Sequence, residues 1–240
     1  MTGHAGSLGS PREVGRVESA VKVYFVTDPT FSDLPRVAAS AVAGGVTCVQ
    51  VSDKDDPDRL AATTVAVRLA VPASVPVLAN DDLAVARSVD GIHVGLDDVS
   101  PVEARRVLGD RAIVGWSVNT VEQLDDLDTL AACDYVAASP VWPTPTKTDT
   151  TAPFGLDGVR VLAARLRGAA RAGGRARPIP LIGIGGISAA TAASVVDAGA
   201  AGVAVVSAVG AASDPAAAAA AIRAAVDRAL DHRLVLAKAR

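Results

Sequence analysis

The amino-acid sequence predicts a single-domain α/β protein, a (β/α)8 TIM barrel. Eight short runs rich in Val, Ile and Leu recur along the 240 residues, and a longer helix-compatible segment follows each of them. Continuous apolar runs are typical of parallel strands that are buried on both faces. Strands that alternate with helices indicate a parallel sheet, and eight such units without a break in composition indicate a closed barrel. An open, doubly wound sheet is the main alternative, but it would rarely contain eight equal units.

The predicted elements follow one another at regular intervals. The strands are expected at 21–27, 46–51, 75–79, 91–94, 112–117, 135–139, 180–184 and 202–207. Three of the helices have clear starts, because Asp56, Ser100 and Asp214 are N-cap residues that each precede a proline. The helices are expected at 33–45, 56–71, 82–89, 100–109, 120–132, 156–170, 188–199 and 214–230.

These elements set the expected domain boundaries. Residues 1–19 contain no apolar core segment, so they are not a signal peptide, and we expect a flexible lead-in there. The barrel is expected over residues 20–231, and residues 232–240 are expected to form a C-terminal tail.

The composition excludes several classes of partner. The formal net charge is −3, which gives no electrostatic reason to expect binding to nucleic acid or to a membrane surface. The most apolar stretch, between Asp197 and Asp214, is shorter than the ~20 apolar residues that a membrane span needs. Cys48 and Cys133 both lie in apolar runs, as buried thiols of a reducing compartment do. We expect a cytoplasmic protein; the sequence is compatible with a homo-oligomer without predicting one.

Polar residues collect where the predicted strands end. Active sites of (β/α)8 barrels lie at the carboxyl ends of the strands, so this distribution is the one that a barrel enzyme needs. The residues, in strand order, are Gln50, Ser52, Asp53 and Lys54; Asn80 and Asp81; Gly95, Asp97 and Asp98; Ser117 and Asn119; Gly185 and Gly186; and Ser207.

Acidic residues follow two neighbouring strands, the third and the fourth. Asp81 comes after one, and Asp97 and Asp98 come after the other. Carboxylate and amide oxygens suit Mg²⁺, which keeps several waters and often bridges to phosphate. The alternative is that Asn80, Asp81 and the residue after them only cap the next helix. Two acidic strand ends side by side favour the metal site.

Small residues follow the last two strands. GIGGIS (183–188) does not have the spacing of a dinucleotide fingerprint, but it brings free backbone N–H groups to the start of a helix, and VSA (206–208) does the same. The loops after strands seven and eight commonly hold phosphate in barrels of this kind. The glycines would equally allow close packing of strand and helix. His93 lies within a strand, where we expect a hydrogen-bonded barrel residue rather than a catalyst.

The segment PVWPTPTKTDTTAPFG (140–155) follows the sixth predicted strand. Its prolines exclude a continuous helix or a central strand, and loops of this length inside a domain are usually functional or disordered. Threonine hydroxyls can donate to phosphate oxygens, and Lys147 supplies a positive charge. We expect a lid that is mobile when empty and ordered over phosphorylated substrates.

Taken together, these segments resemble the thiamine-phosphate synthase family from about Val21 to Val209. The resemblance is carried by GGVTCVQVSDK (44–54), LANDDLAVA (78–86), DGIHVGLDD (90–98), GWSVNT (115–120), SPVWPTPTKTDT (139–150), IGIGGIS (182–188) and GVAVVSA (202–208). Members of this family are TIM barrels that use Mg²⁺. They join hydroxymethylpyrimidine diphosphate to hydroxyethylthiazole phosphate and release diphosphate.

The resemblance also implies a role for each matching residue. Asp81 and Asp98 would bind Mg²⁺, and Ser117 would hydrogen-bond the pyrimidine. The pyrimidine diphosphate would be held by Gln50, Lys54, Asn80 and Lys147, with Ser52 at a further position of the same site. The thiazole phosphate would be received by Thr144, Pro145, Thr146, Gly186, Val206 and Ser207. Lys147 and Ser117 are the residues to which it assigns catalytic roles.

The sequence departs from the family pattern at three places. Ser52 stands where the family has an arginine, Leu96-Asp97 replaces Gln-Glu, and Asn119 replaces a histidine. Loss of a charged hydrogen bond at Ser52 corresponds to about 1.5–3 kcal/mol, roughly ten- to a hundredfold in binding. We therefore expect weakened synthase activity unless another cation takes the place of the missing arginine. Two alternatives are a thiazole tautomerase-like enzyme and a barrel that binds phosphorylated ligands without turnover.

Overall fold

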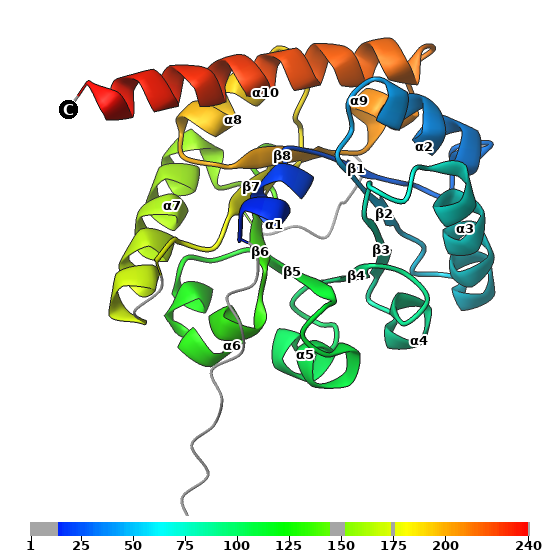
Figure 1. Ribbon diagram of the computed structural model, residues 1–240, viewed down its shortest axis with the longest axis horizontal. Coiled ribbons are helices and arrows are strands. Elements are labelled where there is room, and N and C mark those ends of the chain that lie inside the picture. Colours follow the sequence, from blue (N-terminus) through cyan, green and yellow to red (C-terminus); the bar gives the residue numbers. More distant parts are fainter. Residues whose placement is uncertain (1–13, 145–151, 174–175, 240) are drawn as a thin grey trace, which may run out of the picture.

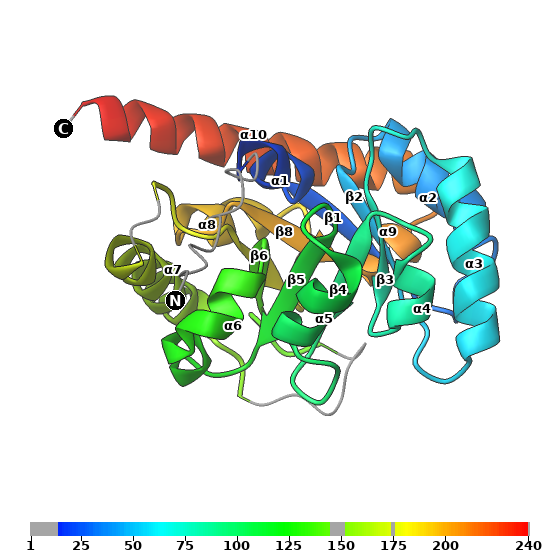
Figure 2. The ribbon, with the colours of Figure 1, turned by 60° about the horizontal axis from the view of Figure 1, so that its bottom comes forward.

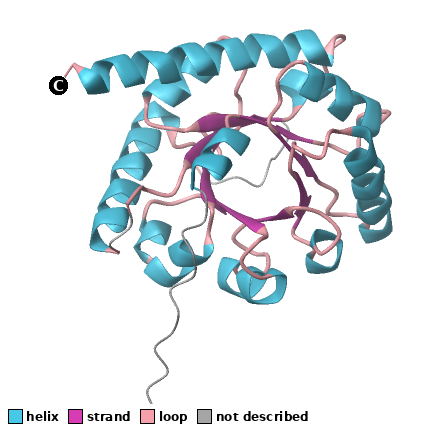
Figure 3. Cartoon of the chain, in the orientation of Figure 1, coloured by secondary structure: helices cyan, strands magenta, loops and turns pink. Residues whose placement is uncertain are grey.

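The computed structural model is a closed barrel of eight parallel strands with helices around it (Figure 1, Figure 3). It describes residues 14–144, 152–173 and 176–239. The strands pair in chain order, and β1 closes the barrel against β8. They are β1 (Val23–Val26), β2 (Cys48–Val51), β3 (Val77–Asn80), β4 (Gly91–Val94), β5 (Ile113–Val118), β6 (Tyr135–Ala138), β7 (Leu181–Ile184) and β8 (Gly202–Val205). The predicted fold class and all eight strand positions are confirmed.

Helices fill the outer ring between the strands. Those that match the prediction are α2 (Leu34–Ala43), α3 (Pro57–Ala70), α4 (Leu83–Ala86), α5 (Pro101–Leu108), α7 (Gly155–Ala172), α8 (Ala192–Asp197) and α10 (Pro215–Lys238). The expected N-caps of α3, α5 and α10 accept hydrogen bonds from the third backbone N–H that follows each of them. The helix expected over 120–132 is instead a 3₁₀ turn, η1 (Glu122–Asp125), and α6 (Leu127–Ala132), because Asp126 caps a new helix between them. The short α9 (Ser207–Gly210) was not predicted.

Two described segments are helical where the sequence predicted a flexible lead-in and a tail: α1 (Val14–Ala20) and the last part of α10 (Figure 2). Helix α1 lies within the segment expected to be a flexible lead-in, and its Val17 packs against the side chains inside the barrel. Val17 and Val21 have helical spacing and both belong to the cluster of side chains inside the barrel, which explains why this part folds. At the other end, α10 continues to Lys238 through the expected tail. Arg233 donates to the carbonyls of Val196 and Ala200, and this ties the extension to the end of α8.

The core has two layers that follow from strand geometry. Successive side chains of a strand point to opposite faces, so alternate residues enter the barrel and the others pack under the helices. Tyr24, Leu78, Tyr135 and Ile182 are among the fully buried side chains that fill the interior. The outer layer is larger and consists mainly of valine, alanine, leucine and isoleucine.

A buried ion pair fastens the amino end of the barrel. Arg105 on α5 reaches Asp134 before β6, with 2.5 Å between Nη2 and Oδ2, and it also donates to three backbone carbonyls. Asp134 in turn accepts the backbone N–H of Val114 at 2.8 Å. These contacts lie at the end of the barrel opposite the polar strand ends. In the described part of the chain, no helix is long and apolar enough to cross a membrane.

Candidate active site

Two carboxylates and one ammonium group meet at the carboxyl ends of β2, β3 and β4. Nζ of Lys54 lies 2.7 Å from Oδ2 of Asp81 and 3.2 Å from Oδ1 of Asp98. Asp98 is held in place by the backbone N–H of Gly95, 2.7 Å from its Oδ2. Asp81 has a left-handed backbone with φ of 61°, which is uncommon outside glycine and is a feature of functional sites. The structure thus brings together the two aspartates that the sequence predicted as metal ligands.

The three groups shift one another's protonation. Burial is the largest influence on Asp81 and raises the pKa of its carboxyl to about 7, with the neighbouring Asp98 adding to the effect. Burial also acts to raise the pKa of Asp98, but hydrogen bonds with Asp81, Gly95 and Lys54 outweigh it and lower that pKa. For Lys54, burial acts to lower the pKa, but the two carboxylates outweigh it and raise the pKa. The pair therefore tends to keep one proton on Asp81 near neutral pH while Asp98 stays ionised.

The same arrangement can be tested for its fit to Mg²⁺. Two carboxylate oxygens already converge on a single positive charge, the ammonium of Lys54. No group of three or more His, Cys, Asp or Glu residues that could hold a metal occurs in the described residues. Mg²⁺ commonly uses only one or two carboxylates and takes its other ligands from water and substrate phosphates. The residues fit a metal ion that binds together with a phosphorylated substrate.

An amide pair connects this charged cluster to the barrel interior. Nδ2 of Asn80 donates to Oδ2 of Asp81 at 2.5 Å, and Nε2 of Gln50 donates to Oδ1 of Asn80 at 2.5 Å. Both amide side chains are buried. Gln50 and Asn80, which were expected to hold a substrate, are therefore connected to Asp81 by hydrogen bonds.

A row of hydroxyl and imidazole groups continues from Gln50 across the barrel. Oη of Tyr24 donates to Oε1 of Gln50 at 3.0 Å and lies 2.9 Å from Oη of Tyr135. His93 joins Tyr135 to Ser117, with 2.8 Å from Nδ1 to Oη and 2.8 Å from Nε2 to Oγ. The prediction that His93 is a hydrogen-bonded barrel residue is confirmed. The sequence did not indicate the two tyrosines, although both occupy alternate, inward-facing strand positions.

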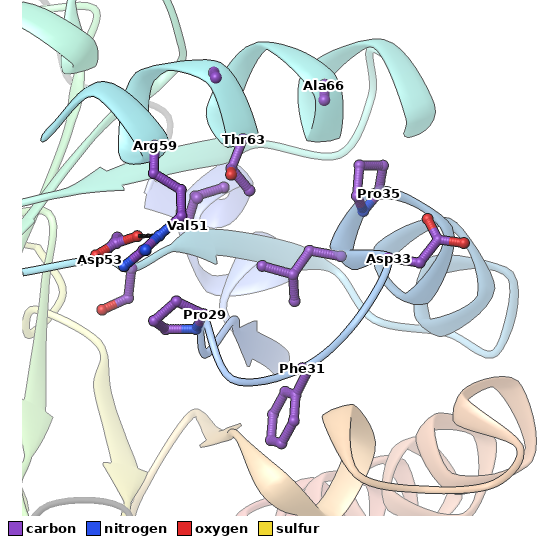
Figure 4. Close-up of a pocket in the computed structure, with 12 residues that line it drawn as sticks. Pro29, Phe31, Asp33, Pro35, Val51, Asp53, Arg59, Thr63 and Ala66 are labelled. Atoms are coloured by element: carbon purple, nitrogen blue, oxygen red, sulfur yellow. Dashed lines mark hydrogen bonds and ion pairs between the residues drawn. The ribbon is translucent and has the colours of Figure 1, made fainter. Parts of the chain in front are cut away.

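Ser52 lines the same pocket as Arg59, a residue of the next helix. It lines a pocket of about 410 Å³ between α2 and α3, together with Asp53 and Arg59 (Figure 4). Arg59, half-exposed on the first turn of α3, forms a two-pronged ion pair with the buried carboxylate of Asp53. The hydrogen bond from Arg59 is the main reason why the pKa of Asp53 is lowered. Arg59 therefore lines the same pocket as Ser52, the position where the family has an arginine, and its charge is paired with that of Asp53.

The loops after β6, β7 and β8 form the other side of the site. Gly185 and Gly186 have φ of 99° and 66°, and a Cβ at Gly186 would lie 2.9 Å from Cβ of Trp142. Only glycine allows this close approach of the loop after β6 to the end of β7. Val206 and Ser207 follow β8 at the start of α9. Thr144 lies at the end of the described part of the loop, whereas Pro145, Thr146 and Lys147 lie outside the described residues.

The remaining candidates take no part in the cluster. Asp97 is exposed, so Asp98 is the residue of that pair that faces Asp81. The backbone N–H of Asn119 donates to Oε1 of Gln123, which stabilises the turn after β5. Cys48 and Cys133 are both buried, as expected.

Comparison with known proteins agrees with this geometry. The family described as thiamine monophosphate synthase matches residues 23–209, which include every strand of the barrel. The chain belongs to the thiamine monophosphate synthase family. It is therefore an enzyme, a transferase of thiamine biosynthesis, as the sequence resemblance predicted.

Individual relatives of the family support the assignment over most of the chain. A thiamine-phosphate synthase of Albidiferax ferrireducens is 40% identical over 215 residues, which are 87% of this chain and 93% of the relative. One from Roseiflexus sp. is 39% identical over 218 residues, 88% of this chain and 87% of the relative. Among solved structures, the thiamine phosphate pyrophosphorylase of Pyrococcus furiosus superposes with a TM-score of 0.75 at 26% identity. That likeness covers 89% of this chain and 99% of the other.

Proposed function

We propose that this chain joins hydroxymethylpyrimidine diphosphate to hydroxyethylthiazole phosphate, giving thiamine phosphate and diphosphate. The observation that carries the proposal is the continuous cluster of Gln50, Asn80, Asp81, Lys54 and Asp98 at the carboxyl ends of three neighbouring strands. Its composition of carboxylates, amides and an ammonium group suits a diphosphate ester bound together with a metal ion. Family membership supports the same reaction.

Asp81 and Asp98 would hold the Mg²⁺ ion. When bound there, Mg²⁺ would supply positive charge that stabilises the diphosphate as it leaves. Lys54 makes its ion pairs with the same two carboxylates, so its ammonium is within reach of any phosphate oxygen bound beside them. We assign to Lys54 the role of neutralising charge on the diphosphate, and Lys147 shares this role in the proposal.

The chemistry of the two substrates allows the reaction to run without a strong base in the protein. The aminopyrimidine ring is electron-rich and can bear positive charge at its methylene as the bond to diphosphate breaks. The nitrogen of the thiazole can then attack that carbon, and no proton needs to be removed by the protein. Gln50, Asn80 and Ser117 orient the pyrimidine, and Ser117 lies within the same hydrogen-bonded network. Orientation of two bound reactants can supply a large part of such a rate enhancement.

The thiazole phosphate is assigned to the loops after β6, β7 and β8. Gly186, Val206 and Ser207 follow neighbouring strands, and the close approach of Gly186 to Trp142 brings the described part of the loop after β6 to the same side. The proposal also assigns Thr144, Pro145 and Thr146 to this phosphate, of which Pro145 and Thr146 lie outside the described residues. Backbone N–H groups at these positions favour an anion. We also place the enzyme in the cytoplasm, acting on small phosphorylated molecules.

Arg59 is the residue that can replace the arginine charge missing at Ser52. Arg59 lines the same pocket as Ser52, so we propose that Arg59 supplies the positive charge that an arginine at position 52 would bring. Its ion pair with Asp53 fixes the guanidinium at this edge of the site. With this charge supplied by Arg59, we expect the enzyme to catalyse the synthase reaction rather than only to bind phosphorylated ligands.

The proposal is tested with purified protein, both substrates and Mg²⁺, with thiamine phosphate as the measured product. We expect product to form, and Asp81→Ala to abolish Mg²⁺-dependent turnover while the circular dichroism spectrum is unchanged. Leu127→Ala, an exposed position on α6 away from the cluster, is the matched control and should retain activity. Binding of both substrates without any product would refute the synthase and support a ligand-binding barrel.

A further inference from the structure

A single row of hydrogen bonds runs from the acidic cluster to Ser117. In order, it contains Asp81, Asn80, Gln50, Tyr24, Tyr135, His93 and Ser117, with each link between 2.5 and 3.0 Å. We call these seven residues the relay. Its two ends are a proposed metal ligand and the residue proposed to contact the pyrimidine. Tyr24 and Tyr135 lie in the middle of the relay, and their hydrogen bonds within it go to Gln50, to each other and to His93.

The acidic end of the relay fixes the direction of its first links. Oδ2 of Asp81 faces both Nζ of Lys54 and Nδ2 of Asn80, so it accepts two hydrogen bonds whatever the other oxygen of this carboxyl does. Asn80 must then present Oδ1 to its other neighbour. That oxygen accepts from Nε2 of Gln50, which leaves Oε1 of Gln50 to face Tyr24.

The acceptor role of Gln50 then determines which hydroxyl donates in each contact of the two tyrosines. A phenol has one proton to give, and Tyr24 gives its own to Oε1 of Gln50. In the contact with Tyr135, Tyr24 can therefore only accept, and Tyr135 must be the donor. Tyr135 has no second proton, so Nδ1 of His93 must donate to it. A neutral imidazole carries one proton, which leaves Nε2 as an acceptor for the hydroxyl of Ser117.

We propose that Tyr24 and Tyr135 are positioning residues that orient the His93 tautomer and thereby make Ser117 a hydrogen-bond acceptor for the amino group of the substrate ring. The hydroxyl proton of Ser117 is then donated to His93, so only the lone pairs of its oxygen can bind a ligand. A ring amino group is a donor and fits, whereas an acceptor at the same place does not. The proposal rests on the proposed function, because it names the part of the pyrimidine that Ser117 recognises.

Packing around the tyrosines supports a relay whose members have fixed positions. Both tyrosines are almost fully buried, and burial raises their pKa values well above 10, so each keeps its single proton. The ring of Tyr135 stacks on His93 with centroids 5.6 Å apart and meets Tyr24 edge-on at 5.8 Å. A Cβ at position 115 would lie 2.1 Å from Cζ of Tyr135, so Gly115 leaves the space that this ring occupies.

The first test reads the tautomer of His93 directly in the ligand-free protein. The chain has three histidines, so ¹⁵N spectra of the imidazoles can be assigned by substitution. At pH 8, well above the ordinary histidine pKa of about 6.5, we expect His93 to be protonated at Nδ1 and not at Nε2. We expect Tyr135→Phe, which keeps the ring and removes the hydroxyl, to abolish this preference. A proton at Nε2 in the unaltered protein would overturn the proposal.

The second test asks whether the relay selects an amino group. The probes are aminopyrimidine hydroxymethyl monophosphate and the same compound with hydrogen in place of the amino group. We expect the unaltered protein to prefer the amino compound by about three- to tenfold, the value of one neutral hydrogen bond. Tyr135→Phe and Tyr24→Phe should bring this preference close to one while affinity for the deamino compound changes little.

Thr64→Val is the matched control for loss of a buried hydroxyl. Oγ1 of Thr64 is buried and has no hydrogen-bond partner among the described residues, so we expect this variant to keep the full preference. Equal weakening of both probes in Tyr135→Phe would show a structural role only and would overturn the proposal. Failure of synthase activity gives a different result, since the histidine tautomer does not depend on turnover.

Discussion

The carboxyl of Asp81 should make Mg²⁺ binding strongly dependent on pH. Its pKa of about 7 leaves roughly a tenth of the group ionised at pH 6 and roughly nine tenths at pH 8. Since a metal ion binds the ionised carboxylate, we expect apparent affinity to rise about tenfold between these values and to level off above them. The pKa of Asp98 is lowered, so Asp98 stays ionised throughout and adds no change in this range.

Ionisation of Asp81 lowers the stability of the fold, whereas ionisation of an ordinary carboxylate in an ion pair raises it. Folding raises the pKa of Asp81. The free energy of unfolding therefore falls as the pH rises from the pKa of the unfolded state, about 3.9, towards the pKa of the folded state, about 7. A metal ion at the site offsets this loss. We therefore expect Mg²⁺ to raise the melting temperature more at pH 8 than at pH 6.

The assay is a titration with Mn²⁺, followed by the electron paramagnetic resonance signal of the free ion, at intervals from pH 5.5 to 8.5. Asp81→Asn removes the titrating group and keeps the shape of the side chain, so we expect weaker binding and no change in affinity between pH 6 and 8. Asp97→Asn is the control, because Asp97 is exposed and outside the cluster. A flat profile in the unaltered protein, or the same slope in Asp81→Asn, would refute the reasoning.

Three further outcomes are expected. Arg105→Ala should lower the free energy of unfolding by about 3–5 kcal/mol in urea titrations, because it removes the cation that is paired with the buried carboxylate of Asp134, whereas the exposed Arg106→Ala should change it little. Gly186→Ala should raise KM for the thiazole phosphate on the order of tenfold, since left-handed backbone disfavours alanine by about 1–2 kcal/mol and a Cβ has no space there. Gly109 also has a positive φ but has open space around it at the opposite end of the barrel, so an equal change in KM for Gly109→Ala would contradict the assignment. Arg59→Ala should weaken binding of inorganic diphosphate several-fold, measured by calorimetry; unchanged binding would leave Arg59 a structural role only.

Local sequence patterns were sufficient for the barrel itself. A strand buried on both faces must be continuously apolar, and a helix needs caps at its ends, so both can be recognised without knowing their neighbours. The same reasoning failed where a pattern is short. Val17 belongs to a helix of seven residues whose stability comes from packing against the barrel interior, and packing is not visible in the sequence.

The site was only partly predictable for the same reason. Asp81, Asp98 and Lys54 were recognisable because they follow strands, and parallel strands bring their carboxyl ends to one edge. Arg59 lines the same pocket as Ser52 because of the contact between α3 and β2. A helix residue seven positions after Ser52 carries no sign of that contact in the sequence.

The sequence by itself therefore determined the fold, the family and the edge of the barrel where chemistry occurs, because these depend on periodicity and on which residues follow the strands. The tertiary structure decided which of those groups touch. Tyr24 and Tyr135 are 111 residues apart and lie 2.9 Å from each other only because the barrel closes and Gly115 leaves space for a ring. The direction of the relay, and with it the role of Ser117, follows from contacts across the barrel that no local pattern encodes.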